Sequence, residues 1–156
     1  MSTDPCCQRL HLVRRILAVV AALLVTGGVV MAGEKSAIET LTKVPLFAFG
    51  GIGYAGTTSE GETAFKSVLA SESAGVDFLH ILKKGTPQAQ CYALVGLRLK
   101  DRPQFDEQVK QFALSKQTVK TCAGCILGTQ PMSSVVTNIQ HGIYDDQAKA
   151  KLRSTR

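Results

Sequence analysis

Hydrophobic residues recur at three- and four-residue spacing along most of the chain after residue 59, and this pattern predicts a mainly α-helical fold. The first helix is expected to begin at the capping box formed by Ser59 and Glu62. There the serine hydroxyl accepts an amide hydrogen bond from the first turn while the glutamate reaches back to the serine amide. The helix is expected to end near Ala70, with one apolar face made of Ala64, Phe65, Val68 and Leu69.

Three more helices follow at short intervals. The second, over 76–84, ends where two lysines precede Gly85, which is a common helix stop. Thr86 and Pro87 cap and open the third helix, which runs to about Leu99 and is apolar nearly all round, so we expect it to be central. The fourth is amphipathic and runs from about Phe105 to Ser115, after the break at 101–103.

The remainder of the chain is less regular. Residues 119–129 combine β-branched residues with two cysteines and two glycines, which indicates an irregular, extended or looped cysteine-containing segment. Pro131 opens a fifth helix that Gly142 ends. Residues 33–144 are therefore predicted to form one small domain of antiparallel helix pairs, similar to a HEAT or α-solenoid fragment. Residues 145–156 are predicted to be a polar C-terminal tail, either a short helix or a frayed end.

The N-terminal 32 residues have the features of a secretory signal peptide. Arg14 and Arg15 precede an apolar run over 16–32, and the small residues Val30 and Ala32 fit a signal-peptidase site. We therefore expect a mature chain that begins near Gly33, in the periplasm or the extracellular space. The alternative is an uncleaved anchor over residues 16–32, which is close to the minimum length that spans a bilayer.

Composition narrows the classes of partner. Three of the 18 basic and one of the 12 acidic residues precede Gly33, so the mature chain keeps 15 basic and 11 acidic residues, a net charge of +4. This excess is mild, and there is no Trp and no basic stretch interleaved with aromatic residues. The sequence therefore argues against nucleic acid as a partner.

The glycine-rich segment 50–58 lies between a buried apolar run, 44–49, and the first helix, and it is expected to be a turn packed on the domain. Its G-x-G-x-x-G pattern suggests a nucleotide or another small ligand, but the capping box places the helix start too far beyond the last glycine for a dinucleotide site. If the domain has a binding loop, we expect it here, because loops on a rigid scaffold often carry binding. The candidate residues are Gly51, Gly53, Tyr54, Gly56, Thr57, Thr58, Glu60 and Glu62.

Three cysteines remain after signal cleavage, and an exported protein can oxidise them. We favour a structural disulfide from Cys91 to either Cys122 or Cys125, with a Cys122–Cys125 pair as the third possibility. The C-x-x-C spacing of Cys122 and Cys125 also permits thiol–disulfide oxidoreductase activity as an alternative function. No metal site and no cofactor are predicted.

Other catalytic signals are weak. His80 lies among apolar residues and is expected to be a partly buried packing residue, whereas His141 is expected to cap a helix end. No G-x-S-x-G elbow is present for a hydrolase nucleophile. The segments 49–62, 92–97 and 124–126 resemble a family of small exported bacterial proteins, some named after microcin gene clusters, whose biochemical role is not assigned. This resemblance implies a bacterial envelope protein and supplies no catalytic residues.

The sequence therefore predicts an exported helical protein that binds another protein or an envelope component, and it is more consistent with a non-enzymatic role than with an enzyme. A thiol–disulfide oxidoreductase is the first alternative, and a small-ligand or nucleotide binder is the second.

Overall fold

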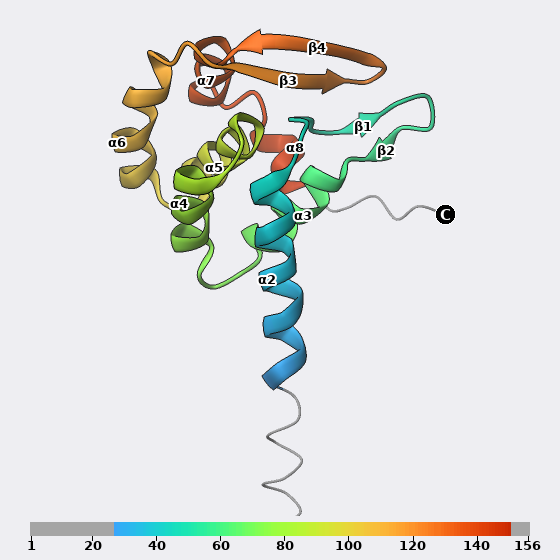
Figure 1. The fold of residues 1–156 in the computed structure, drawn as a ribbon, viewed down its shortest axis with the longest axis vertical. Coiled ribbons are helices and arrows are strands. Elements are labelled where there is room, and N and C mark those ends of the chain that lie inside the picture. Colours follow the sequence, from blue (N-terminus) through green and yellow to red (C-terminus); the bar gives the residue numbers. More distant parts are fainter. Residues whose placement is uncertain (1–26, 151–156) are drawn as a thin grey trace, which may run out of the picture. The chain divides into compact units, whose positions relative to one another are not determined.

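The computed structural model describes the backbone of residues 27–150 and the side chains of residues 35–150. Residues from 34 onward form one compact unit, distinct from the N-terminal 33 residues. The described residues contain seven helices and four short strands, so the predicted mainly helical fold is confirmed (Figure 1). The elements are α2 (Gly27–Lys43), β1 (Gly51–Ile52), β2 (Thr57–Thr58), α3 (Glu60–Leu69), α4 (Ala74–Lys84), α5 (Pro87–Lys100), α6 (Arg102–Ala113), β3 (Thr118–Ala123), β4 (Ile126–Pro131), α7 (Met132–Gln140) and α8 (Asp145–Lys149).

Helix α5 is the centre of the domain, as its apolar sequence predicts. Residues 91–97 are all buried, and α3, α4, α6, α7 and α8 contact the helix. Gly96 allows the closest approach, because a Cβ atom there would lie 2.3 Å from Cε2 of Phe78 on α4. The ring of Phe78 therefore packs directly on the α5 backbone.

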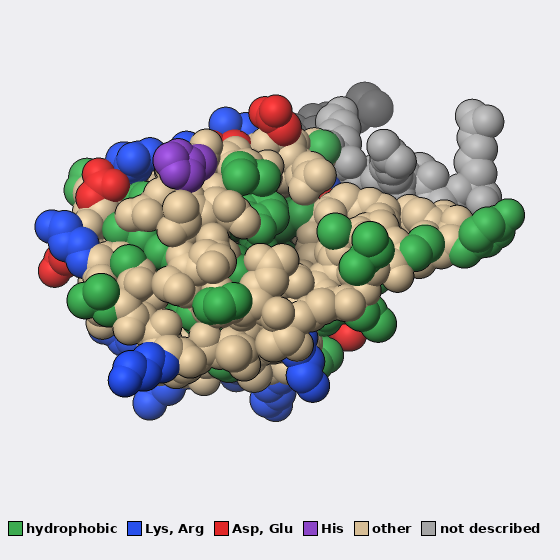
Figure 2. Space-filling view, turned by 90° about the horizontal axis from the view of Figure 1, so that it is seen from above, with side chains coloured by type: hydrophobic (Ala, Val, Ile, Leu, Met, Phe, Trp, Pro, Cys, Tyr) green, Lys and Arg blue, Asp and Glu red, His purple; other side chains and the backbone are tan. Residues whose placement is uncertain are grey.

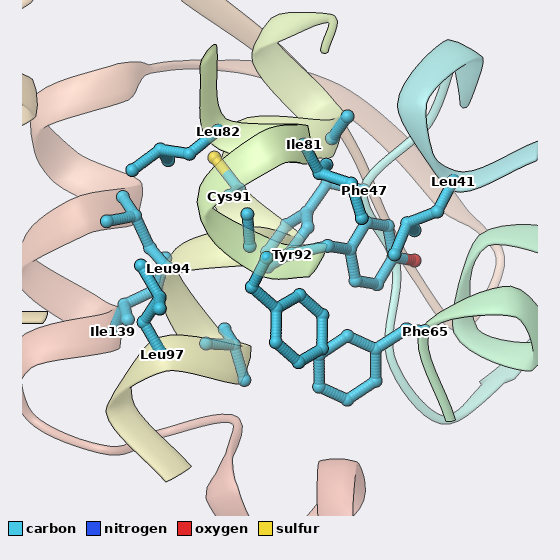
Figure 3. Close-up of a cluster of buried hydrophobic side chains, with 14 of the residues drawn as sticks. Leu41, Phe47, Phe65, Ile81, Leu82, Cys91, Tyr92, Leu94, Leu97 and Ile139 are labelled. Carbon is cyan, nitrogen blue, oxygen red and sulfur yellow. The ribbon is translucent and has the colours of Figure 1, made fainter. Parts of the chain in front are cut away.

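Aromatic rings from distant parts of the chain pack into one cluster beside α5 (Figure 3). Phe47 and Phe49 come from the apolar run before β1, and the Phe47 ring centroid lies 4.8 Å from that of Tyr92. Phe65 of α3 lies 5.2 Å from Phe49, and Tyr144, just before α8, lies 5.1 Å from Phe47. The apolar run, residues 44–49, therefore connects the packed helices to the two hairpins.

The cysteine segment is more ordered than its sequence suggests. Strands β3 and β4 pair antiparallel without a bulge over six residues each, from Thr118 with Pro131 to Ala123 with Ile126. Gly124, at φ 59°, and Cys125 form the two-residue turn, and glycine suits the first position of such a turn. The segment is thus a regular hairpin rather than an irregular loop. The sequence signal for this hairpin was the Gly-X pair at 124–125, which lies between two β-rich runs.

The glycine-rich segment also differs from expectation. Strands β1 and β2 form a small antiparallel hairpin whose turn carries Tyr54, and this side chain is fully exposed. The turn therefore projects from the domain rather than packing on it. Figure 1 shows the two hairpins extending side by side, away from the helices.

Both ends of the domain are tied to the core. At one end, Leu41 of α2 is completely buried. At the other end, residues 145–149 form the short helix rather than a frayed end, with Ala148 buried. Arg98 of α5 holds α8 through an ion pair with Asp145, Nε to Oδ1 at 3.1 Å.

The signal-peptide prediction lies mostly outside the described residues. Residues 1–26 are not described, and the expected cleavage position after Ala32 falls within α2. No helix in the described part of the chain is both long enough and apolar enough to cross a membrane.

Candidate functional site

The two hairpins are joined where they leave the domain. The Phe47 amide donates to the Lys120 carbonyl at 2.9 Å, and the Cys122 amide donates to the Phe47 carbonyl at 3.1 Å. Further out, the Gly53 amide donates to the Gly124 carbonyl at 2.9 Å, which links the two turns. The outer edge of β3 is therefore covered by the segment that leads into β1, and the hairpins form one continuous projection.

Three large apolar side chains are exposed at the outer end of this projection. Tyr54 is 103% exposed, Ile126 76% and Leu127 73%. We call these three residues the tip surface, and Figure 2 shows hydrophobic side chains at the end of the projecting part. Ile126 and Leu127 are neighbours in β4, so their side chains point to opposite faces of the hairpin. Because exposed apolar side chains gain free energy when a partner covers them, the tip surface is the first candidate for binding.

The base of the glycine turn is fixed by a buried ion pair. Glu62 Oε1 lies 2.6 Å from Lys66 Nζ, and the two side chains are only 4% and 11% exposed. The other carboxylate oxygen, Oε2, accepts a 2.8 Å hydrogen bond from the Gly50 amide. The capping-box prediction is therefore half right. Ser59 Oγ accepts from the Glu62 amide at 3.0 Å, but the glutamate side chain contacts the glycine segment rather than the Ser59 amide.

A second polar group fixes the same region from the core side. The Tyr92 hydroxyl donates to the Ala48 carbonyl at 2.6 Å and accepts from the Ala48 amide at 3.0 Å. The Ser59 hydroxyl also donates to the Ala48 carbonyl, at 3.2 Å. Burial raises the pKa of Tyr92 to about 12. The Tyr92 hydroxyl therefore has a structural role: it holds the backbone at Ala48, and its donor and acceptor positions are both used within the protein.

Half of the predicted loop residues share one cavity. Gly51, Gly56, Thr58 and Glu62 line a space of about 220 Å³, together with Gly50, Lys66, Gln147 and Ala150. The other four predicted residues, Gly53, Tyr54, Thr57 and Glu60, do not line it. Helix α3 begins at Glu60, so three residues separate its start from the last glycine of the G-x-G-x-x-G pattern. The cavity is smaller than the roughly 300 Å³ at which ligand pockets usually start.

The three cysteines are free thiols in the structure, and the expected bridge from Cys91 is not formed. Cys91 is completely buried on α5, where its Sγ lies 3.4 Å from Met132 Sδ, and burial raises its pKa to about 12. Cys122 and Cys125 belong to the projecting hairpin, and Cys125 is exposed in its turn. The expected disulfide is not formed because Cys91 lies in the core, away from the turn that carries Cys125.

The two histidines in the described part of the chain are both exposed. His80 is exposed rather than partly buried, since it lies on the outer side of α4, and His141 follows α7 as its C-cap residue. Within residues 27–150, no group of three or more His, Cys, Asp or Glu side chains is arranged to hold a metal ion.

One feature of the candidate site was missed by sequence reasoning. All six residues of β4 are exposed, and β4 is the edge strand of its hairpin. Exposure of β4 was hard to predict because Ile126 and Leu127 are apolar, and such residues in a β-rich segment usually indicate burial. The absence of any charged residue over 121–131 points the same way, so the polar residues Thr129 and Gln130 were the only available signal of exposure in β4.

Comparisons with protein-family models, with curated proteins and with solved structures find no match to this chain. The function is therefore argued from the residues themselves.

Proposed function

We propose that this chain is an exported, non-enzymatic helical protein that binds another protein, or a protein component of the cell envelope, through the tip surface. The observation that carries the proposal is the exposure of Tyr54, Ile126 and Leu127 on two hairpins that hydrogen bonds join into one projection. Tyrosine at such a position is typical of residues that contribute most to protein binding, because it buries a large area at a small entropic cost.

The rest of the domain holds the two hairpins rigidly, which is consistent with the proposed binding role. The aromatic cluster, the Tyr92 hydrogen bonds and the Glu62–Lys66 ion pair all meet at the segment from which the hairpins project. A projection held in this way loses little conformational entropy on binding, which favours affinity. Catalysis would need a nucleophile, acid or base in a cleft. His80 and His141 are exposed, and the most strongly shifted pKa values among the described residues, those of Cys91 and Tyr92, belong to core residues.

Export, cleavage near Gly33 and membership of the small exported bacterial proteins that the sequence resembles are part of this proposal. The α-solenoid-like stacking of helix pairs also stays a prediction. In the structure, five helices contact α5.

Thiol–disulfide exchange by Cys122 and Cys125 is the second candidate. One observation favours it, namely the exposure of Cys125 in the turn that follows Cys122. One observation weighs against it, because the Cys122 thiol donates to the Gly124 carbonyl at 3.4 Å and is therefore engaged within its own turn. Insulin reduction by the purified protein that is lost in Cys122→Ser would establish this alternative.

The test of the main proposal is photo-crosslinking in the cells that make the protein. A photoreactive phenylalanine replaces Tyr54 in the full chain, and a second variant carries it at the exposed, remote position His80. We expect one crosslinked protein from position 54 and none from position 80. The crosslink should disappear when Leu127→Asp is added. Equal crosslinking from both positions, or no crosslink from position 54, would show that the tip surface is not the binding site.

A further inference from the structure

The edge of β4 offers a more specific mode of binding. We infer that β4 accepts an extended segment of the partner protein as an additional strand, and that this segment carries an apolar residue and an acidic residue on the face that Leu127 and Thr129 share. The inference rests on the proposed function and deepens it, because it assigns the chemistry of the partner.

Edge strands in natural proteins are normally protected by short length, charged side chains, bulges or internal prolines, because an open edge pairs with other chains. Strand β4 has little of this protection. It is six residues long, pairs with β3 without a bulge, contains no charged residue, and has its proline only at the last position, Pro131. By contrast, β1 and β2 have two residues each, and the outer edge of β3 is covered by residues 47–53.

The backbone groups that β4 presents can be derived from the register. The Cys122 amide and the Lys120 carbonyl point away from β4, since both bond to Phe47 on the other side. Cys122 lies opposite Leu127, and Lys120 lies opposite Thr129. In an antiparallel pair, residues opposite each other either bond to one another or both point outward. The amide and carbonyl groups of Leu127 and Thr129 therefore point outward along the free edge.

The charge on the β3–β4 hairpin indicates the chemistry of the partner segment. Lys120 is the only charged residue over 117–131, is exposed, and shares a face with Leu127 and Thr129. A strand added beside β4 lies about 10 Å from β3, since neighbouring strands are about 4.8 Å apart. A lysine and a glutamate side chain can span this distance, so an acidic residue opposite Thr129 would pair with Lys120. An apolar residue on the same face would cover Leu127.

A second copy of this chain fits the edge less well. Pairing of β4 with β4 of another copy would bring two hairpins together that contain one lysine each and no acidic residue. Like charges on one small sheet are unfavourable, so complementarity favours an acidic segment from a different protein.

The experiment uses two fluorescein-labelled synthetic peptides with threonine at every second position. In the first peptide the alternate positions are valine and glutamate in turn, and in the second each glutamate is lysine. Binding to the full chain is measured by anisotropy under reducing conditions at physiological salt. We expect the glutamate peptide to bind about fivefold more tightly, as one partly exposed ion pair provides. The variant Lys120→Glu should reverse this preference.

Two variants at position 129 test the edge itself. Thr129→Pro removes the outward amide, and a proline is tolerated on the solvent side of an edge strand. It should weaken binding of the glutamate peptide about tenfold, which corresponds to the loss of one hydrogen bond. Thr129→Val changes the side chain but keeps the amide, and it should bind like the wild type. Circular dichroism of each variant verifies the hairpin.

The outcomes that would overturn the inference are separate from those that test the proposed function. Equal affinity for both peptides in the wild type and in Lys120→Glu, or unchanged binding in Thr129→Pro, excludes strand addition at β4. Concentration-dependent dimerisation that Thr129→Pro abolishes would assign the edge to a second copy and also overturn the inference. If the Tyr54 crosslink forms normally in Thr129→Pro, the tip surface still binds a partner, but β4 does not.

Discussion

Helix α5 and strand β4 differ in almost every physical respect, although both are rich in apolar or uncharged residues. Helix α5 has nine buried residues, whereas β4 has none. The buried helix is in contact with five other helices, and within residues 27–150 the exposed strand pairs only with β3. Since burial of apolar area stabilises a domain and exposed apolar area is available to a partner, we expect changes in α5 to affect stability and changes in β4 to affect the proposed binding.

The largest effect is expected from removing the side chain that joins the two regions. Tyr92→Ala removes a completely buried ring and the hydroxyl that holds Ala48. The free energy of unfolding should fall by about 4 kcal/mol, as for other buried aromatic residues. Urea denaturation measures this. A loss below about 1 kcal/mol would mean that the aromatic cluster is not a well-packed core.

Breaking the ion pair below the glycine turn should have the next largest effect. Glu62→Ala leaves Lys66 without its partner in a nearly buried position and removes the acceptor of the Gly50 amide. We expect a loss of about 3 kcal/mol in unfolding free energy. Glu60→Ala is the matched control, because this exposed glutamate lies in the same first turn of α3. Equal losses in the two variants would contradict a specific role for the pair.

Stability at alkaline pH should report on the core alone. Burial raises the pKa of Tyr92 from 10 to about 12 and that of Cys91 from 9 to about 12, so the folded state favours the protonated form of both groups. Their contribution is complete below pH 9 and is lost as the pH rises through 12. The unfolding free energy should therefore decrease between pH 9 and 12. In Tyr92→Phe this decrease should be smaller, and an unchanged slope would contradict the assignment.

The thiols provide a direct comparison of the two regions. Cys125 is exposed on the hairpin, and Cys91 is buried on α5. In the reduced native protein, a thiol reagent such as dithionitrobenzoate should modify Cys125 within minutes, whereas Cys91 should react only after unfolding. Peptide mapping of the modified protein identifies the residues. Rapid modification of Cys91 in native protein would show that the core around α5 opens easily.

Changes at the tip surface should have the smallest effect on stability. Leu127→Ser replaces an exposed side chain and should change the unfolding free energy by less than about 0.5 kcal/mol. The same substitution should weaken the crosslink from position 54. A large loss of stability would mean that Leu127 belongs to the folded core rather than to a binding surface.

The same comparison explains what the sequence could predict. Helix α5 was predictable because its cap, its N-terminal proline and its apolar residues all indicate one structure, and Ser59 likewise marks the start of α3. The second contact of Glu62 was not predictable. Its partner, the Gly50 amide, comes near only after the chain has folded back over 12 residues.

Long-range placement also explains the error about the cysteines. The spacing of Cys91, Cys122 and Cys125 contains no information on which side of α5 the first thiol occupies. That side is set by packing against Met132 of α7, which is 41 residues further on. The tip surface depends on the contact between Gly53 and Gly124, and a single sequence gives no indication of such a pairing.

The ion pair between Arg98 and Asp145 has a consequence for the timing of folding. It fixes the last described helix, together with the Tyr144 ring that completes the aromatic cluster and the buried Ala148. A nascent chain that stops before residue 144 lacks these contacts and leaves Phe47 uncovered on one side. The described domain can therefore complete its core only after residues 144–148 have been synthesised, so its folding follows the synthesis of α8.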